Sequence, residues 1–159
     1  MLTGMPGAGK STVGVILAKV LGMNFIDSDL LIQEQEGMLL KDIIKKEGLQ
    51  GYIEIENQVN RDISVENTVI ATGGSVVYCS EAMEHFCKTA KVVYIKLEFD
   101  TISKRLGNIR QRGVVLRDGQ TLLDLYKERT PLYEKYAHIT IEAEGLGMEE
   151  LMERICMTI

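Results

Sequence analysis

The chain has 159 residues, of which 45% are apolar and 26% charged, an ordinary composition that argues against a fibre or a disordered segment. At this length we expect one compact domain spanning residues 1–159. A formal net charge of -5 argues against broad binding to nucleic acid or to anionic membranes, because such partners require a surplus of Lys and Arg.

Cysteine usage and hydropathy point to the cytoplasm. Cys79, Cys87 and Cys156 are odd in number and lack a metal-type Cys/His spacing, which favours reduced thiols. No apolar run approaches the ~20 residues of a membrane span, and no charged-then-apolar secretory leader is present. We therefore expect a cytoplasmic protein, a monomer, with neither a nucleic acid nor a membrane as partner.

Short apolar strands alternate with amphipathic helical segments along the chain. The predicted strands cover residues 1–3, 24–26, 68–72, 92–97 and 139–141. The predicted helices cover residues 10–21, 30–35, 39–46, 52–63, 81–87, 101–106, 121–136 and 148–155. This alternation predicts an α/β fold with a mostly parallel sheet covered on both faces and with ligand groups at the carboxyl ends of the strands.

A phosphate-binding motif follows the first strand. Residues 4–11 read G-M-P-G-A-G-K-S and satisfy G-x-x-x-x-G-K-[ST]. Glycines let the backbone N–H groups turn toward phosphate oxygens, and the following helix N-terminus adds positive potential. Lys10 is expected to reach the β- and γ-phosphates of ATP, and Ser11 to ligate the Mg²⁺ that bridges them. The predicted ATP-binding residues of this loop are Gly4, Gly7, Ala8, Gly9, Lys10, Ser11 and Thr12.

The strand that feeds this loop is short. Only residues 1–3 precede Gly4, whereas strands commonly have five or six residues. This predicts a chain that begins inside its own first strand.

Two alternating carboxylates follow the second predicted strand. Asp27 is placed to hold Mg²⁺ through water, and Asp29 to accept a proton from the attacking hydroxyl or to orient it. The alternative role for Asp29 is the N-cap of the helix at 30–35. Both side chains should project at the carboxyl edge of the sheet.

Three further segments carry candidate acceptor-side residues. Gly73 and Gly74 follow a buried-type strand, where backbone can approach a ligand closely. Arg129 lies beside a proline that interrupts a helical pattern, and its guanidinium could clamp a carboxylate or a phosphate. Residues 107–120 contain Arg112, are rich in glycine and show little periodicity, which suits a mobile lid or a plain solvated loop.

Together these segments resemble the shikimate kinase family. The P-loop, F-I-D-S-D at 25–29, T-G-G at 72–74, a lid arginine and R-x-P-L-Y at 129–133 occur in the family's order and approximate spacing, over essentially the whole chain. The resemblance implies a P-loop kinase fold, a three-layer α/β/α structure with a central five-stranded parallel sheet, a lid at about 107–120 and acceptor-binding helices at about 30–63. It also implies ATP and Mg²⁺ as cofactors and a small hydroxylated acceptor.

The resemblance also implies roles for single residues. Asp27 matches the magnesium-side aspartate, and Asp29 matches the aspartate that contacts substrate hydroxyls. Arg112 matches the lid arginine near the transferred phosphate, and Arg129 matches an arginine that grips the substrate carboxylate. Arg105 matches an arginine that packs against adenine, although an exposed helix arginine is an equal alternative. Gly73 and Gly74 match the substrate-facing glycines.

The chain departs from the family on the acceptor side. The family's F-R-x-x-E segment reads Y-I-E-I-E at 52–56, so Ile53 stands where a second carboxylate-binding arginine is expected, and Ser75 replaces the third glycine of T-G-G-G. A charge-assisted contact contributes on the order of 1.5 to 3 kcal/mol, so affinity for shikimate is expected to fall by about tenfold or more. Arg61 lies ~12 Å further along the helix, too far to substitute.

The predicted activity is ATP- and Mg²⁺-dependent phosphorylation of a hydroxyl, with shikimate as the first acceptor. Glu54 placed beside Asp29, together with Arg129, would suit an amino-alcohol acceptor such as homoserine or threonine, whereas a solvent-facing Glu54 would not. An ATP-binding regulatory module without turnover is the remaining alternative, for which Ile53 is the only hint.

Overall fold

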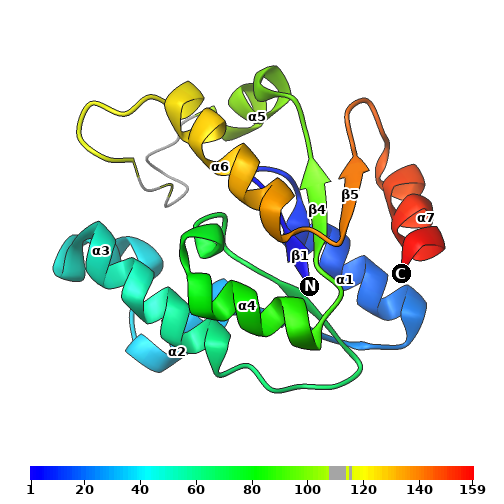
Figure 1. Cartoon of the computed structure of the whole chain (residues 1–159), viewed down its shortest axis with the longest axis horizontal. Coiled ribbons are helices and arrows are strands. Elements are labelled where there is room, and N and C mark those ends of the chain that lie inside the picture. Colours follow the sequence, from blue (N-terminus) through cyan, green and yellow to red (C-terminus); the bar gives the residue numbers. More distant parts are fainter. Residues whose placement is uncertain (108–113, 115) are drawn as a thin grey trace.

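The computed structural model describes residues 1–107, 114 and 116–159 (Figure 1). Its centre is one sheet of five strands in the order β2-β3-β1-β4-β5, and every neighbouring pair is parallel. The predicted α/β fold with a five-stranded parallel sheet is confirmed. The strands are β1 (Leu2–Thr3), β2 (Asn24–Asp27), β3 (Thr68–Ala71), β4 (Val93–Lys96) and β5 (Ile139–Glu142).

Helices cover both faces of the sheet. One layer holds α1 and α7, which contact each other and the strands, while α4 and α6 lie on the opposite side, in front of the sheet in Figure 1. No helix in the described ranges is long and apolar enough to cross a membrane. The helices are α1 (Lys10–Leu21), α2 (Ser28–Glu36), α3 (Leu40–Arg61), α4 (Ser80–Thr89), α5 (Phe99–Leu106), α6 (Leu122–Tyr136) and α7 (Met148–Thr158), with a 3-10 turn η1 (Val76–Tyr78).

The shortest strand lies at the centre of the sheet. Leu2 of β1 pairs with Ala71 of β3 on one side and with Val93 of β4 on the other, and only 1% of Leu2 is exposed. Because α1 follows β1 directly, burial of this strand fixes the position of the intervening loop against the sheet. The P-loop is therefore held in place by the buried strand that precedes it.

Two details of the helices bear on the predictions. The helices predicted at 39–46 and 52–63 correspond to the two parts of α3 on either side of Gly48, whose φ of 72° is non-helical, so the predicted break between them is confirmed. Helix α6 matches the helix predicted at 121–136 and continues through Pro131. A proline inside a helix costs about 3 kcal/mol, and burial of Leu125 and Tyr133 on α6 offsets this cost.

All three cysteines, Cys79, Cys87 and Cys156, are free thiols, as predicted.

Candidate active site

Two cavities lie at opposite edges of the sheet. The larger, about 870 Å³, surrounds Met1 and the amino ends of the strands, and the smaller, about 310 Å³, opens at the carboxyl ends. We assign function to the smaller cavity, because charged side chains converge on it and because ligands bind at the carboxyl edge of parallel sheets. Its walls include Gly7, Gly9, Lys10, Ser11, Thr12, Asp29, Gly73, Gly74 and Arg129.

The phosphate-binding loop encloses the side chain of Lys10. Its ammonium Nζ donates to the carbonyl oxygens of Gly4 at 2.8 Å and Met5 at 3.1 Å, so the side chain bends back across the loop. Burial lowers the pKa of Lys10 to about 8, and Asp29 opposes that shift. Phosphate oxygens entering the loop would supply the negative charge that this buried ammonium otherwise lacks.

Glycine is required where the loop approaches the sheet. At Gly4 φ is 146°, and an added Cβ would lie 2.7 Å from the carbonyl oxygen of Ile95 in β4. Neither the conformation nor the contact tolerates a side chain. Within the same loop, the side chain of Ala8 is only 2% exposed and lies near Gly4, whereas Gly7 and Gly9 line the cavity.

Ser11 and Asp27 are the residues that fit Mg²⁺. Ser11 lies in the first turn of α1 and lines the cavity, and Asp27 ends β2 at the same edge of the sheet. No cluster of three or more His, Cys, Asp or Glu side chains suited to a metal occurs within the described part of the chain. Mg²⁺ is usually bound by one or two protein oxygens, waters and the substrate phosphates.

Asp27, rather than Asp29, is the N-cap of α2. The Oδ1 atom of Asp27 accepts a hydrogen bond from the backbone N–H of Asp29 at 3.0 Å. The capping role considered for Asp29 is therefore wrong, and the Asp29 carboxylate is left to face the cavity.

A second buried carboxylate, Glu56 of α3, lies beside Asp29. A Cβ added at Gly73 would be 2.6 Å from both Asp29 Oδ1 and Glu56 Oε1, and neither oxygen has a hydrogen-bond partner within the described residues. Burial raises the pKa of Asp29 to about 6 and that of Glu56 to about 7. Asp29 lines the cavity, and Glu56 lies buried directly behind Gly73 beside it.

The turn after β3 lies between the P-loop and Arg129. A Cβ added at Gly74 would lie 2.7 Å from Pro6 Cδ and 3.1 Å from Arg129 Nη1. The phenolic O–H of Tyr133 donates to the Gly74 carbonyl oxygen at 2.5 Å and holds this turn against α6. A side chain at Gly74 would therefore push Pro6 of the P-loop away from Arg129, whereas a side chain at Gly73 would displace the carboxylates of Asp29 and Glu56.

Arg129 forms the cationic wall of the cavity. It is 2% exposed, its Nε donates to the phenolic oxygen of Tyr78 at 3.3 Å, and its guanidinium carbon lies 5.1 Å from the centre of the Tyr78 ring. A buried guanidinium with no carboxylate ion-pair partner within the described residues is suited to an anionic ligand.

The other predicted cationic residues are not all placed by the structure. Arg105 donates from Nη1 to the carbonyl oxygen of Gly7 at 3.3 Å, so it lies over the P-loop. Arg112, predicted as the lid arginine, lies outside the described residues. Arg61 pairs with Glu81 of α4 at 2.6 Å, away from the cavity, as its distance along α3 predicts.

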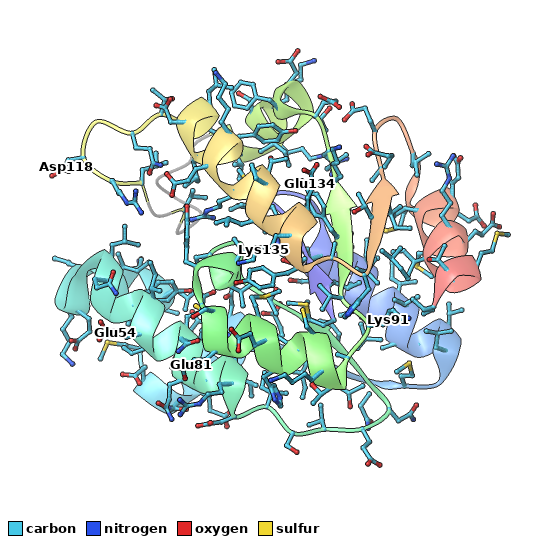
Figure 2. All side chains as sticks on the ribbon, viewed as in Figure 1. Glu54, Glu81, Lys91, Asp118, Glu134 and Lys135 are labelled. Atoms are coloured by element: carbon cyan, nitrogen blue, oxygen red, sulfur yellow. The ribbon has the colours of Figure 1, made fainter. Side chains whose placement is uncertain are left out.

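The glutamate that lies beside Asp29 is Glu56, and not Glu54. Glu54 is exposed on α3 and accepts from Gln50 Nε2 at 3.3 Å, and Figure 2 shows it at the surface. Glu56, fully buried, was visible in the sequence as the last residue of Y-I-E-I-E, but its burial depends on α3 packing against the β3 turn. Tyr52 also lines the cavity, a role that sequence reasoning missed.

Comparison with known proteins supports this assignment. A family model described as shikimate kinase matches residues 6–159. A shikimate kinase of Sulfurihydrogenibium sp. is 35% identical over 99% of this chain and 95% of that relative. A second, from Thermodesulfovibrio yellowstonii, is 34% identical over 98% of this chain and 91% of the relative.

The chain belongs to the shikimate kinase family. Among solved structures, shikimate kinase from Acinetobacter baumannii in complex with shikimate matches with a TM-score of 0.89 and 34% identity, covering 98% of this chain and 88% of that one. A gluconokinase from Sinorhizobium meliloti, at 16% identity and a TM-score of 0.58, shares the fold alone. The predicted P-loop kinase fold is confirmed. Like its family, the chain is an ATP- and Mg²⁺-dependent kinase that phosphorylates a hydroxyl of a small acceptor.

Proposed function

We propose that the acceptor is shikimate and that Asp29 and Arg129 bind it at opposite sides of the small cavity. The observation that carries this proposal is that Lys10, Asp29 and Arg129 line one cavity of about 310 Å³. A molecule with hydroxyls at one end and a carboxylate at the other can contact Asp29 and Arg129 together. Its reacting hydroxyl then lies on the same side as the phosphate-binding loop.

On the donor side, the P-loop residues Gly4, Gly7, Ala8, Gly9, Ser11 and Thr12 form the phosphate site around Lys10. The ammonium of Lys10 leaves the Gly4 and Met5 carbonyls to contact the β- and γ-phosphates. Mg²⁺, held by Ser11 and through water by Asp27, would offset the negative charge that develops during transfer. Arg105 and Arg112 remain predicted contacts of adenine and of the transferred phosphate.

On the acceptor side, the Asp29 carboxylate accepts a hydrogen bond from the reacting hydroxyl. It takes the hydroxyl proton as the new O–P bond forms and the bond from the γ-phosphorus to the β-phosphate oxygen breaks, which releases ADP. Burial raises the pKa of Asp29 to about 6, which is closer to pH 7 than the pKa of an exposed aspartate. A pKa near the working pH suits a general base. Backbone groups of Gly73 and Gly74 line the path of the substrate, and the Arg129 guanidinium receives the carboxylate.

The acceptor assignment is tested by measuring ADP formation with purified protein, Mg²⁺ and ATP. We expect shikimate to stimulate ADP release, with 3-phosphoshikimate as product. Homoserine, threonine and gluconate serve as comparison acceptors in the same coupled assay. If one of these stimulates turnover and millimolar shikimate does not, the shikimate assignment is wrong while the kinase assignment stands.

The isoleucine at position 53, where the family pattern has an arginine, is the observation that favours a different acceptor. It lies one helical turn before Glu56, where an arginine would stand beside a buried carboxylate. The amino-alcohol alternative, however, required Glu54 beside Asp29, and Glu54 is exposed. We therefore favour shikimate bound through one arginine over an acceptor with an ammonium group.

The variant Ile53→Arg tests whether a second arginine strengthens binding of the substrate carboxylate. We expect the KM for shikimate to fall by about tenfold, since a charge-assisted hydrogen bond to a carboxylate contributes about 1.5 to 3 kcal/mol. The KM for ATP should not change, because Ile53 lies outside the P-loop. The control Ile53→Gln adds a polar group without charge and should leave both constants nearly unchanged; an equal improvement with Gln would contradict the electrostatic explanation.

A further inference from the structure

The hydroxyl of Tyr78 links Arg129 to its neighbour in the chain, Glu128. Tyr78 lies at the end of η1, after the glycine turn, and accepts from Arg129 Nε at 3.3 Å. The same hydroxyl donates to Glu128 Oε1 at 2.6 Å. A cation, a neutral hydroxyl and a carboxylate thus form a chain in which each hydrogen bond polarises the next.

Glu128 also binds the segment that precedes α6. Gln120 Nε2 donates to Glu128 Oε2 at 3.1 Å, and Arg117 Nη2 lies 3.5 Å from Oε1. The Gln120 side-chain oxygen in turn accepts from the backbone N–H of Arg117 at 3.1 Å. Both carboxylate oxygens of Glu128 are therefore used, which holds this carboxylate in one orientation.

This arrangement leaves the cavity side of Arg129 open. Nε points to Tyr78 and the Tyr78 ring lies beside the guanidinium, whereas Nη1 lies next to Gly74 at the cavity. An arginine side chain loses about 2 kcal/mol of rotamer entropy when it is ordered on binding. Contacts that order it beforehand remove part of that cost from ligand binding.

We propose that Tyr78, oriented by Glu128, is a positioning residue that sets the guanidinium of Arg129 for the acceptor carboxylate. The inference rests on the proposed function of Arg129 as the carboxylate-binding residue. Tyr78 does not line the cavity and acts on the acceptor only through Arg129. The segment at 116–120, which reaches the surface at Asp118 (Figure 2), thereby shares its anchor with the acceptor site.

The first test is Tyr78→Phe, which keeps the ring beside Arg129 and removes the hydroxyl. We expect the KM for shikimate to rise by about three- to tenfold, with the KM for ATP unchanged. The matched control is Tyr126→Phe on α6, which also removes a hydrogen-bonded hydroxyl. The hydroxyl of Tyr126 donates to the Leu97 carbonyl oxygen at 2.9 Å and has no contact with Tyr78 or Glu128 among the hydrogen bonds of the described residues. This control should leave the KM for shikimate unchanged; an equal rise in both variants would overturn the proposal.

The second test is a double-mutant cycle with Glu128→Gln. If Glu128 acts through the Tyr78 hydroxyl, the double variant should have nearly the same KM for shikimate as Tyr78→Phe alone. Fold-changes that multiply would show that the two residues act separately and would overturn the linkage.

A third measurement separates this proposal from the identity of the acceptor. The Nε–H signal of Arg129 is followed by NMR in the ligand-free protein, where we expect it to shift and to exchange faster with water in Tyr78→Phe but not in Tyr126→Phe. An unchanged signal overturns the positioning role even if shikimate is the substrate. A changed signal with no shikimate-dependent turnover supports the positioning role and rejects the acceptor.

Discussion

Asp29→Asn is expected to lower kcat with shikimate by about 10² to 10⁴, the range for loss of a positioned acid–base group. The amide keeps the shape of the side chain and its place beside Gly73, but it cannot accept the proton of the reacting hydroxyl. Binding of ATP should change little, because Asp29 does not belong to the P-loop. Steady-state kinetics and nucleotide titration measure the two effects separately.

The control for Asp29 is Asp42→Asn, an exposed aspartate in the first turn of α3. That variant carries the same chemical change outside the cavity and should retain normal turnover. Asp29→Asn with unimpaired turnover would reject Asp29 as base or positioning group. A loss of ATP binding equal to the loss of turnover would instead place Asp29 on the donor side.

Lys10→Met is expected to reduce kcat/KM for ATP by about 10² to 10³, the usual cost of removing a preorganised charge from a transition state. Methionine retains most of the buried aliphatic stem, so the loop should keep its packing. The loss arises because no other buried ammonium faces the transferred phosphoryl group within the described cavity walls. Coupled measurement of ADP formation at several ATP concentrations gives the constant.

The matched control is Lys19→Met in the last turn of the same helix, where the lysine is exposed. Its kinetics should equal those of the unmodified protein. Far-UV circular dichroism of both variants shows whether the helix content of the whole protein is preserved. Near-normal phosphoryl transfer by a folded Lys10→Met protein would remove the P-loop lysine from the proposed mechanism.

The donor half of the site was predictable because it is local in sequence. Residues 4–11 form one loop whose backbone conformation is set by its own glycines, so spacing alone identifies Lys10 and Ser11. The strands were also predictable, because buried parallel strands are short apolar runs bounded by helices. The break between the two parts of α3 at Gly48 and the range of α6 were predictable as well, although α6 contains Pro131.

The acceptor half depends on contacts between distant segments. Glu54 and Glu56 are two positions apart on one helix, and helical geometry alone turns them in different directions. Only the packing of α3 against the β3 turn decides that Glu56 is buried beside Asp29 and that Glu54 faces solvent. The link from Tyr78 to Glu128 and Arg129 likewise joins residues about 50 positions apart.

By itself, the sequence determined the fold class, the P-loop and the kinase family, since these follow from local periodicity and from motifs whose residues are neighbours in the chain. Tertiary structure alone decided that Glu56 rather than Glu54 lies buried beside Asp29, how Arg129 is held and where the cavity lies. The physical reason is that the burial and orientation of a side chain arise from the packing of elements that are far apart in the sequence. The spacing of residues along a single segment does not predict that packing.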